Sequence, residues 1–233
     1  MTPMASVFTP SYNKGAYAVD AIRSILAQDY GDFEYWILEN STDDGATRAE
    51  IAPLLDDPRV IYQEIEIHPD WRSRVYIPAW LLNQWYPKAN GRYIFYLSDD
   101  DLLDPATIGT CVRFLEEDPG RHVCWFSMRR VAAPRPGPVA GDLDGGFPAD
   151  KPMGHDTPRH HVDCRIDGGQ VAHRRTCLDG LQQPWFPEDA DGGAASHADG
   201  LFLQKLASRY TFHPIPAHFL TKRLTPISAW TQC

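Results

Sequence analysis

The stretch Tyr93-Ile94-Phe95-Tyr96-Leu97-Ser98-Asp99-Asp100-Asp101-Leu102-Leu103 is an apolar, aromatic-rich run that stops on three consecutive carboxylates. The run predicts a buried β-strand, because such residues favour strands and the polar residues after them end one. Three adjacent aspartates repel one another, and a hard divalent cation offsets this repulsion because carboxylate oxygens are its preferred ligands. If the cation also holds a diphosphate, the strand end becomes a site for a nucleotide-activated substrate.

A simpler alternative for the acidic run is a solvated turn that caps the following helix. Asp104 would then be the N-cap and Pro105 would lie in the first helical turn. This alternative explains Asp104 and leaves the three preceding aspartates unexplained, so the sequence favours the metal site.

The composition predicts one soluble, acidic domain. The chain has 233 residues, enough to bury a full core. Its 22 basic and 31 acidic residues give a net charge of −9, which argues against a nucleic-acid-binding surface. The sequence shows no membrane-spanning apolar stretch and no leader-like start. The five cysteines are odd in number and form no Cys-x-x-Cys pair, so we expect reduced thiols and a cytoplasmic location.

Short strands and amphipathic helices alternate through the first 131 residues. Strands are expected at residues 5–9, 33–38, 60–62, 93–97 and 123–128, with helices near 17–26, 47–55, 77–88 and 104–117. This alternation predicts parallel strands joined by right-handed crossovers. Because ligands bind at the carboxyl ends of such strands, the polar turns after the first, second and acidic strands should converge.

Residues 132–160 break this pattern, since they are rich in proline and glycine and lack any period. They predict a long loop. Beyond the loop we expect a strand near residues 170–172 and a helix near 199–208.

Several segments, taken together and in order, resemble family 2 glycosyltransferases of the GT-A fold, closest to the spore-coat polysaccharide type. The segments are residues 6–14, 24–28, 32–34, 91–94 and 98–101. The resemblance implies the α/β nucleotide-diphospho-sugar transferase fold, a single domain with a Rossmann-like mixed sheet flanked by helices. Residues 1–131 would be the nucleotide-sugar-binding half, and residues 132–233, with the loop at 132–160, the acceptor-binding and catalytic half.

The resemblance implies a nucleobase site at the turns after the first two strands. Tyr12 would stack on the base, with the backbone of Thr9 and Pro10 beside it. Glu39 and Asn40 stand where the family usually carries two aspartates that read the base and the ribose. The Asn40 amide oxygen can still accept a hydrogen bond from N3–H of the base, so UDP- and dTDP-sugars are the expected donors. A turn without a binding role is the alternative for both positions.

The acidic run corresponds to the family's Asp-x-Asp-like motif. Asp99 would meet the ribose, and Asp100 would bind Mg²⁺ or Mn²⁺ bridging the two phosphates, with Asp101 in support. The family often has aspartate at the position of Ser98, so these roles could shift by one residue.

The resemblance resumes after the loop. Asp167 would bind an acceptor hydroxyl, and Asp199, at the start of a helix, would be the catalytic base that takes the acceptor proton. A helix N-cap is the alternative for Asp199. His218 would be a third metal ligand, and Lys222 and Arg223 would stabilise the leaving diphosphate, unless they are a structural histidine and surface cations.

Two further choices stay open in the sequence, and a third is decided. Arg72 or Arg74 supplies the family's basic residue near the base. The rivals of the catalytic base are Glu188, Asp189 and Asp191. A zinc site is not expected among His155, His160, His161 and Asp163, because their spacing matches no closed site.

The implied activity is metal-dependent, inverting transfer of a sugar to a small-molecule or carrier-bound acceptor, with natural-product biosynthesis as the expected setting and polysaccharide assembly as the alternative. A nucleotidyltransferase would share the carboxylates, but residues 10–15 are not a glycine-rich phosphate loop. A non-catalytic sugar-nucleotide-binding module is the alternative outside enzymes; intact Asp99, Asp100 and Asp199 argue against it. Expected partners are the donor, the acceptor and a second copy in a homodimer, with neither nucleic acid nor a membrane span.

Overall fold

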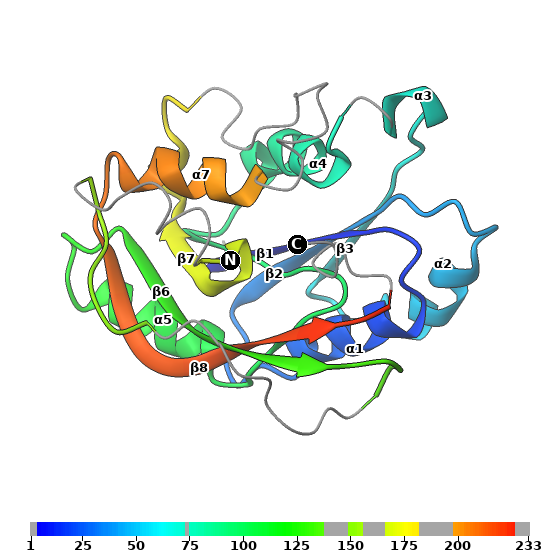
Figure 1. Cartoon of the computed structure of the whole chain (residues 1–233), viewed down its shortest axis with the longest axis horizontal. Coiled ribbons are helices and arrows are strands. Elements are labelled where there is room, and N and C mark those ends of the chain that lie inside the picture. The colour runs from blue at the N-terminus through cyan, green and yellow to red at the C-terminus, as the bar shows by residue number, and fades with distance from the viewer. Residues whose placement is uncertain (1–3, 73–74, 138–148, 156–165, 182–197, 227–233) are drawn as a thin grey trace.

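An eight-stranded mixed sheet, in the order β3-β2-β1-β4-β7-β6-β8-β5, runs through the molecule (Figure 1). The computed structural model describes residues 4–72, 75–137, 149–155, 166–181 and 198–226. The strands are β1 (Ala5–Ser11), β2 (Phe33–Glu39), β3 (Val60–Glu64), β4 (Tyr93–Tyr96), β5 (Leu102–Leu103), β6 (Val123–Ala132), β7 (Val171–Arg174) and β8 (Phe212–Leu224). The helices are α1 (Ala16–Leu26), α2 (Ala46–Ile51), α3 (Pro69–Arg72), α4 (Ile77–Trp85), α5 (Thr107–Glu116) and α7 (Ala198–Ala207). Short 3-10 turns cover Ala52–Leu54, Tyr86–Lys88, Gly168–Gln170 and Arg175–Leu178.

The strand directions confirm one part of the expected topology and correct another. β3, β2, β1 and β4 are parallel neighbours, as the alternation predicts. β7 then lies between β4 and β6 and runs antiparallel to both, so β6 does not continue the parallel sheet directly. The alternation could not reveal this because β7 comes from the second half of the chain. The mixed sheet flanked by helices, which the resemblance implies, is confirmed.

Two hydrophobic cores lie on opposite faces of the sheet. Phe8 packs in the core beneath α4 and α7, and its neighbour Val7 packs in the core beneath α1 and α5. Successive side chains of a strand point to opposite faces, so a fully buried β1 feeds both cores. Figure 1 shows α4 and α7 on one side of the sheet and α1 and α5 on the other. A strand buried on both faces leaves only its ends for a polar site.

The start of α5 differs from the predicted capping arrangement. The helix begins at Thr107, and Ala106 is the N-cap residue, so the prediction of Asp104 at the N-cap is wrong. The Asp104 carboxylate accepts a hydrogen bond from the Ala106 amide in the preceding turn. The first turn of α5 is capped instead by Gln28, whose amide oxygen accepts from the Ile108 amide at 3.0 Å.

Gly91 permits the close approach of β4 to β1. A Cβ atom at this position would lie 2.4 Å from the carbonyl carbon of Ala5 and 2.5 Å from the amide nitrogen of Ser6. The hydroxyl of Ser6 accepts from the Gly91 amide and donates to the Glu34 carboxylate. The family-like segments at 32–34 and 91–94 therefore meet at the amino ends of the strands, where they serve the fold.

The long strands β6 and β8 pair in parallel, with register irregularities around Ser127. β6 extends to Ala132, beyond the expected end at residue 128. Of the predicted loop, residues 138–148 and 156–160 lie outside the described residues, and Met153 forms a β-bridge with Phe212. β8 also pairs with β5, Leu102 opposite Thr221, which brings the last strand to the acidic run. In the described part of the chain, no helix has the length and apolar character needed to cross a membrane.

Candidate functional site

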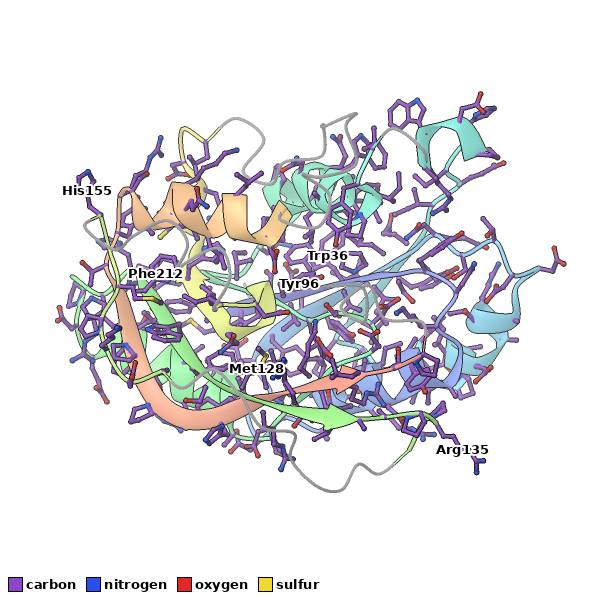
Figure 2. All side chains as sticks on the ribbon, viewed as in Figure 1. Trp36, Tyr96, Met128, Arg135, His155 and Phe212 are labelled. Atoms are coloured by element: carbon purple, nitrogen blue, oxygen red, sulfur yellow. The ribbon has the colours of Figure 1, made fainter. Side chains whose placement is uncertain are left out.

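The three aspartates form a buried turn directly after β4. Asp99, Asp100 and Asp101 are 8%, 4% and 0% exposed, and the Asp101 amide donates to the Ser98 carbonyl to close the turn. The Ser98 hydroxyl pairs with the phenol of Tyr96, which points toward the middle of the molecule (Figure 2). Burial, followed by the negative charge of Asp100, raises the pKa of Asp99 to about 7. This concentration of carboxylates must be balanced by cations.

Two cations from β8 balance the inner part of this turn. The Lys222 ammonium nitrogen lies 3.0 Å from Asp101 Oδ2 and 2.9 Å from Asp167 Oδ2. These flanking carboxylates outweigh burial and raise the pKa of Lys222 well above its usual value. The Arg223 amide donates to Asp101 Oδ1 at 3.0 Å. The last strand therefore holds the acidic turn from within the protein.

The guanidinium of Arg223 is fully buried, and each of its nitrogens has a protein acceptor. It donates to Asp20 at 2.8 Å, to the Tyr17 carbonyl at 2.9 Å and to the Asp100 carbonyl. Lys222 is only 4% exposed. In this structure the charges of Lys222 and Arg223 hold the turn, and their contact with the leaving diphosphate stays a prediction.

Lys14 supplies a third cation, at the outer edge of the turn. Its ammonium nitrogen lies 2.7 Å from Asp100 Oδ2, and its side chain is 13% exposed. The same carboxylate oxygen lies 3.5 Å from the Thr225 hydroxyl. Sequence reasoning assigned no role to Lys14. The feature of the sequence that could have identified Lys14 is its place in the turn after β1, because parallel topology brings this turn beside the turn after β4.

Asn13 joins the turn after β1 to the turn after β2. Its φ of 51° lies in the left-handed region, which asparagine tolerates better than most residues. Its side-chain oxygen accepts from the Thr42 amide at 2.8 Å, and its own amide donates to the Ser41 hydroxyl at 2.7 Å. Tyr12 next to it donates its amide to Asp99 Oδ2 at 2.8 Å. The three predicted turns therefore converge, as expected.

The predicted base site holds Tyr12, Asn40 and Arg72 together. The Arg72 guanidinium carbon lies 4.2 Å from the centre of the Tyr12 ring, which is 39% exposed. Arg72 also donates to the Asn40 side-chain oxygen at 2.9 Å, while the Asn40 amide nitrogen donates to the Ser11 carbonyl. Of the two candidate arginines, Arg72 is thus beside Tyr12, and Arg74 lies outside the described residues.

Three other residues predicted at the base site are buried. Glu39 is 3% exposed, and its carboxylate accepts from the Ser41 amide at 2.7 Å. Its side chain shapes the turn, and the contact of Glu39 with the base or ribose stays a prediction. Thr9 and Pro10 lie within β1, and the Thr9 hydroxyl accepts from the Tyr35 phenol at 3.0 Å. Their side chains face the interior.

Asp199 lies in the first turn of α7, one residue after its start. Its two carboxylate oxygens accept from the amides of Gly168 and Gly200 at 3.3 and 2.9 Å. Burial, followed by the charge of Asp167, raises the pKa of Asp199 to about 6. A carboxylate with this pKa is poised to take a proton near neutral pH. The rival residues Glu188, Asp189 and Asp191 lie outside the described residues.

Asp167, the predicted acceptor contact, is buried and holds a turn in this structure. It is 3% exposed, its Oδ1 accepts from the Gly169 amide, and its Oδ2 accepts from Lys222. Together with Gln170 it forms a capping box on the 3-10 turn Gly168–Gln170. The buried carboxylate supports the segment that contacts Asp199, and its contact with an acceptor hydroxyl stays a prediction.

His218 is exposed on β8, opposite Ser127. It precedes Lys222 by four residues, roughly 13 Å along an extended strand, and no described hydrogen bond joins it to Asp100. The structure therefore does not bring the predicted third ligand to the acidic turn. His155 points outward at the periphery (Figure 2), and His160, His161 and Asp163 lie outside the described residues. Within the described ranges, no three His, Cys, Asp or Glu side chains are arranged to hold a metal.

Tyr76, at the start of α4, belongs to the site although sequence reasoning missed it. Burial raises the pKa of its phenol, and the negative charge of Asp199 adds to the rise. Burial raises the pKa of Tyr96 as well, with a contribution from Tyr76. The Tyr76 phenol is therefore close enough to Asp199 to respond to its charge, whereas the amphipathic pattern of α4 predicted only core packing.

Comparison with known proteins agrees with this fold. The model of the family described as glycosyl transferase family 2 matches residues 6–140, more than half of the chain. The chain belongs to glycosyl transferase family 2. Protein CgeD of Bacillus subtilis strain 168 is 26% identical over 229 residues, which cover 98% of this chain and 52% of CgeD. WcaA of Escherichia coli strain K12, whose name links it to colanic acid biosynthesis, is 32% identical over 103 residues, 44% of this chain and 34% of WcaA.

Solved structures confirm the GT-A fold. TarS 1–349 of S. aureus in complex with UDP-GlcNAc has a TM-score of 0.73 and 16% identity over 98% of this chain and 61% of that one. The mannosyltransferase PcManGT of Pyrobaculum calidifontis, in complex with GDP-Man and Mn²⁺, has a TM-score of 0.64 and 18% identity. The match covers 99% of this chain and 60% of the PcManGT chain. The chain thus spans about half to three fifths of the length of CgeD and these structural neighbours.

Proposed function

We propose that the chain transfers a sugar from a nucleoside diphosphate sugar to a carrier-bound saccharide acceptor. One observation carries the proposal: the Tyr12 amide donates to Asp99 in the acidic turn, and Asp199 is linked to the same turn through the Gly168 amide and the Asp167–Lys222–Asp101 contacts. Membership of glycosyl transferase family 2 and the nucleotide-sugar complexes of the structural neighbours support it.

The donor nucleoside is bound at the turns after β1 and β2. The exposed ring of Tyr12 stacks on the base, and Asp99 accepts a hydrogen bond from the ribose. Arg72 lies beside Tyr12 and provides a donor for the base edge, and the buried Asn40 amide oxygen accepts from Arg72 and holds it there. UDP and dTDP remain the proposed nucleotides, and GDP is the alternative to test because GDP-Man occupies one structural neighbour.

The acidic turn fits a divalent cation held jointly with the donor. Asp100 already has a cationic partner 2.7 Å from Oδ2, so the site accommodates positive charge there. The described residues provide no complete ligand set, so the diphosphate oxygens would supply the remaining ligands. Mg²⁺ or Mn²⁺ at Asp100 would neutralise charge that develops on the leaving diphosphate.

Asp199 acts as the base of an inverting displacement. The acceptor hydroxyl attacks the anomeric carbon, the bond from that carbon to the diphosphate oxygen breaks, and the hydroxyl proton passes to the Asp199 carboxylate. The amides of Gly168 and Gly200 fix the orientation of this carboxylate, and its raised pKa strengthens it as a base.

The acceptor is proposed as a carrier-bound saccharide, since the name of WcaA points to polysaccharide assembly. A natural-product intermediate is the second candidate for the acceptor. A nucleotidyltransferase and a non-catalytic module remain the alternatives to the transfer activity itself; turnover of a sugar donor with release of UDP excludes both.

The test is a calorimetric titration of UDP, dTDP and GDP, each with Mn²⁺ and with EDTA. Wild type and Asp100→Ala are compared, with Asp150→Ala as the control because Asp150 is exposed and distant in sequence from the turn. We expect binding of UDP or dTDP that requires both the metal and Asp100. If no nucleotide binds to wild type under either condition, the proposed function is wrong.

A further inference from the structure

Lys14 differs from the other cations around the acidic turn in its surroundings. Lys222 lies between two carboxylates with 5% of its side chain exposed, and the Arg223 side chain is fully buried. Lys14 comes from the turn between β1 and α1, and its side chain is 13% exposed. Its long, flexible side chain can therefore move while the turn keeps its place.

The contact of Lys14 falls on one of the two oxygens with which Asp100 would bind a metal. Lys14 Nζ and the Thr225 hydroxyl both approach Asp100 Oδ2, at 2.7 and 3.5 Å. A divalent cation that binds this oxygen takes the position of the ammonium group, because two cations cannot share that space. Asp100 is thus neutralised by the protein itself when no donor is present.

We propose that Lys14 is an exchangeable cation: it competes with the divalent metal for Asp100 in the donor-free protein, and it moves to the donor diphosphate when metal and donor bind together. The inference rests on the proposed function. The same turn carries Tyr12, two residues before Lys14, so the displaced ammonium group stays close to a nucleotide stacked on that ring. An oxyanion of the diphosphate is a suitable new partner, since ammonium groups bind phosphate well.

Exchange of this kind couples the two binding reactions. Without nucleotide, the metal must displace Lys14 from a buried carboxylate. The apparent affinity for the metal is then the intrinsic affinity multiplied by the fraction of molecules in which Asp100 is accessible. With nucleotide, Lys14 gains the diphosphate, and this penalty is removed. By linkage, the metal then strengthens nucleotide binding by the same factor.

The experiment measures Mn²⁺ binding by the spin-resonance signal of the free ion, with and without saturating UDP. It compares wild type, Lys14→Met, Lys14→Gln and the control Lys151→Met, which removes an exposed lysine from another part of the chain. Lys14→Gln serves as the second variant if Lys14→Met does not fold, and circular dichroism checks each fold. We expect both Lys14 variants to bind Mn²⁺ about tenfold more tightly than wild type without UDP, about 1.4 kcal/mol.

The ratio of Mn²⁺ affinities with and without UDP separates exchange from simple electrostatics. Loss of one positive charge alone strengthens Mn²⁺ binding equally in both conditions and leaves the ratio unchanged. Exchange predicts that the ratio falls about tenfold in the Lys14 variants and stays at the wild-type value in Lys151→Met. An unchanged ratio, or unchanged Mn²⁺ affinity without UDP, overturns the proposal. If wild type binds Mn²⁺ but no nucleotide, the proposed function fails instead, and the nucleotide-free titration still decides whether Lys14 competes at Asp100.

Discussion

The ammonium nitrogen of Lys222 lies 2.9 Å from Asp167 Oδ2, deep inside the protein. This ion pair joins β8 to the segment before β7, and Lys222 also contacts Asp101 at 3.0 Å. The Lys222 side chain therefore links the acidic turn after β4 to the segment that contacts Asp199.

Replacement of Lys222 by methionine should strongly destabilise the fold. Removal of one member of a buried ion pair costs about 3–5 kcal/mol, because the remaining charge is left without a partner. Urea unfolding should show this loss for Lys222→Met, and the double variant Lys222→Met/Asp167→Asn should recover part of it. The exposed control Lys151→Met should change the free energy of unfolding by no more than about 0.5 kcal/mol. Equal stability of Lys222→Met and wild type would contradict the structural role of the pair.

Gly91→Ala should also lower stability, for a steric reason. The added methyl group would lie 2.4 Å from the Ala5 backbone, so β4 must move away from β1. Forced overpacking of this kind costs about 1–3 kcal/mol, and backbone contact places this site at the upper end. Gly31→Ala is the matched control, since a Cβ atom there meets nothing within 4 Å. If Gly91→Ala and Gly31→Ala lowered the temperature of thermal unfolding equally, the packing explanation would be ruled out.

Asp199→Asn should abolish most transfer activity while the protein keeps its fold. General-base catalysis contributes roughly 10²- to 10⁴-fold, and an amide cannot take the acceptor proton. The wild-type rate should rise with pH up to about 6 and then level off, because the base must be ionised and its pKa is about 6. Asp150→Asn should keep both the rate and the profile. A wild-type acid limb near pH 4 would show that Asp199 does not have the raised pKa during the reaction.

Tyr12→Ala should weaken UDP binding, since stacking of an aromatic ring on a base is worth about 1–3 kcal/mol. Tyr12→Phe is the informative comparison because it keeps the ring and loses only the hydroxyl contact to Thr42. Calorimetry with Mn²⁺ should therefore give near wild-type affinity for Tyr12→Phe and roughly 5- to 150-fold weaker binding for Tyr12→Ala. Similar losses in both variants would assign the effect to the hydroxyl.

Sequence patterns predicted the first half of the fold well because each strand and helix there has a clear period and a polar end. The convergence of Tyr12 with Asp99 and Asp100 follows from parallel topology alone. A strand was expected near residues 170–172, but its antiparallel place between β4 and β6 could not be predicted, since it follows a long stretch without a pattern.

The roles of charged residues in the second half were harder to predict than their positions. Lys222 and Arg223 come close to the acidic turn, as the resemblance implies, yet their side chains point into the protein. Which face of β8 is buried depends on its pairing with β5 and on the register irregularities near Ser127, and neither is visible in the sequence. The same limit applies to Asp167, whose buried partner lies 55 positions later.

The pairing of Arg223 with Asp101 spans 122 positions of the chain. During synthesis on the ribosome, the acidic turn therefore emerges long before the strand that neutralises it. Until β8 docks, Asp101 lacks both Lys222 and the Arg223 amide, and three carboxylates repel one another in an unfinished sheet. Recognition of the donor is thus expected to arise only after β8 has docked, although the residues that contact it are made first.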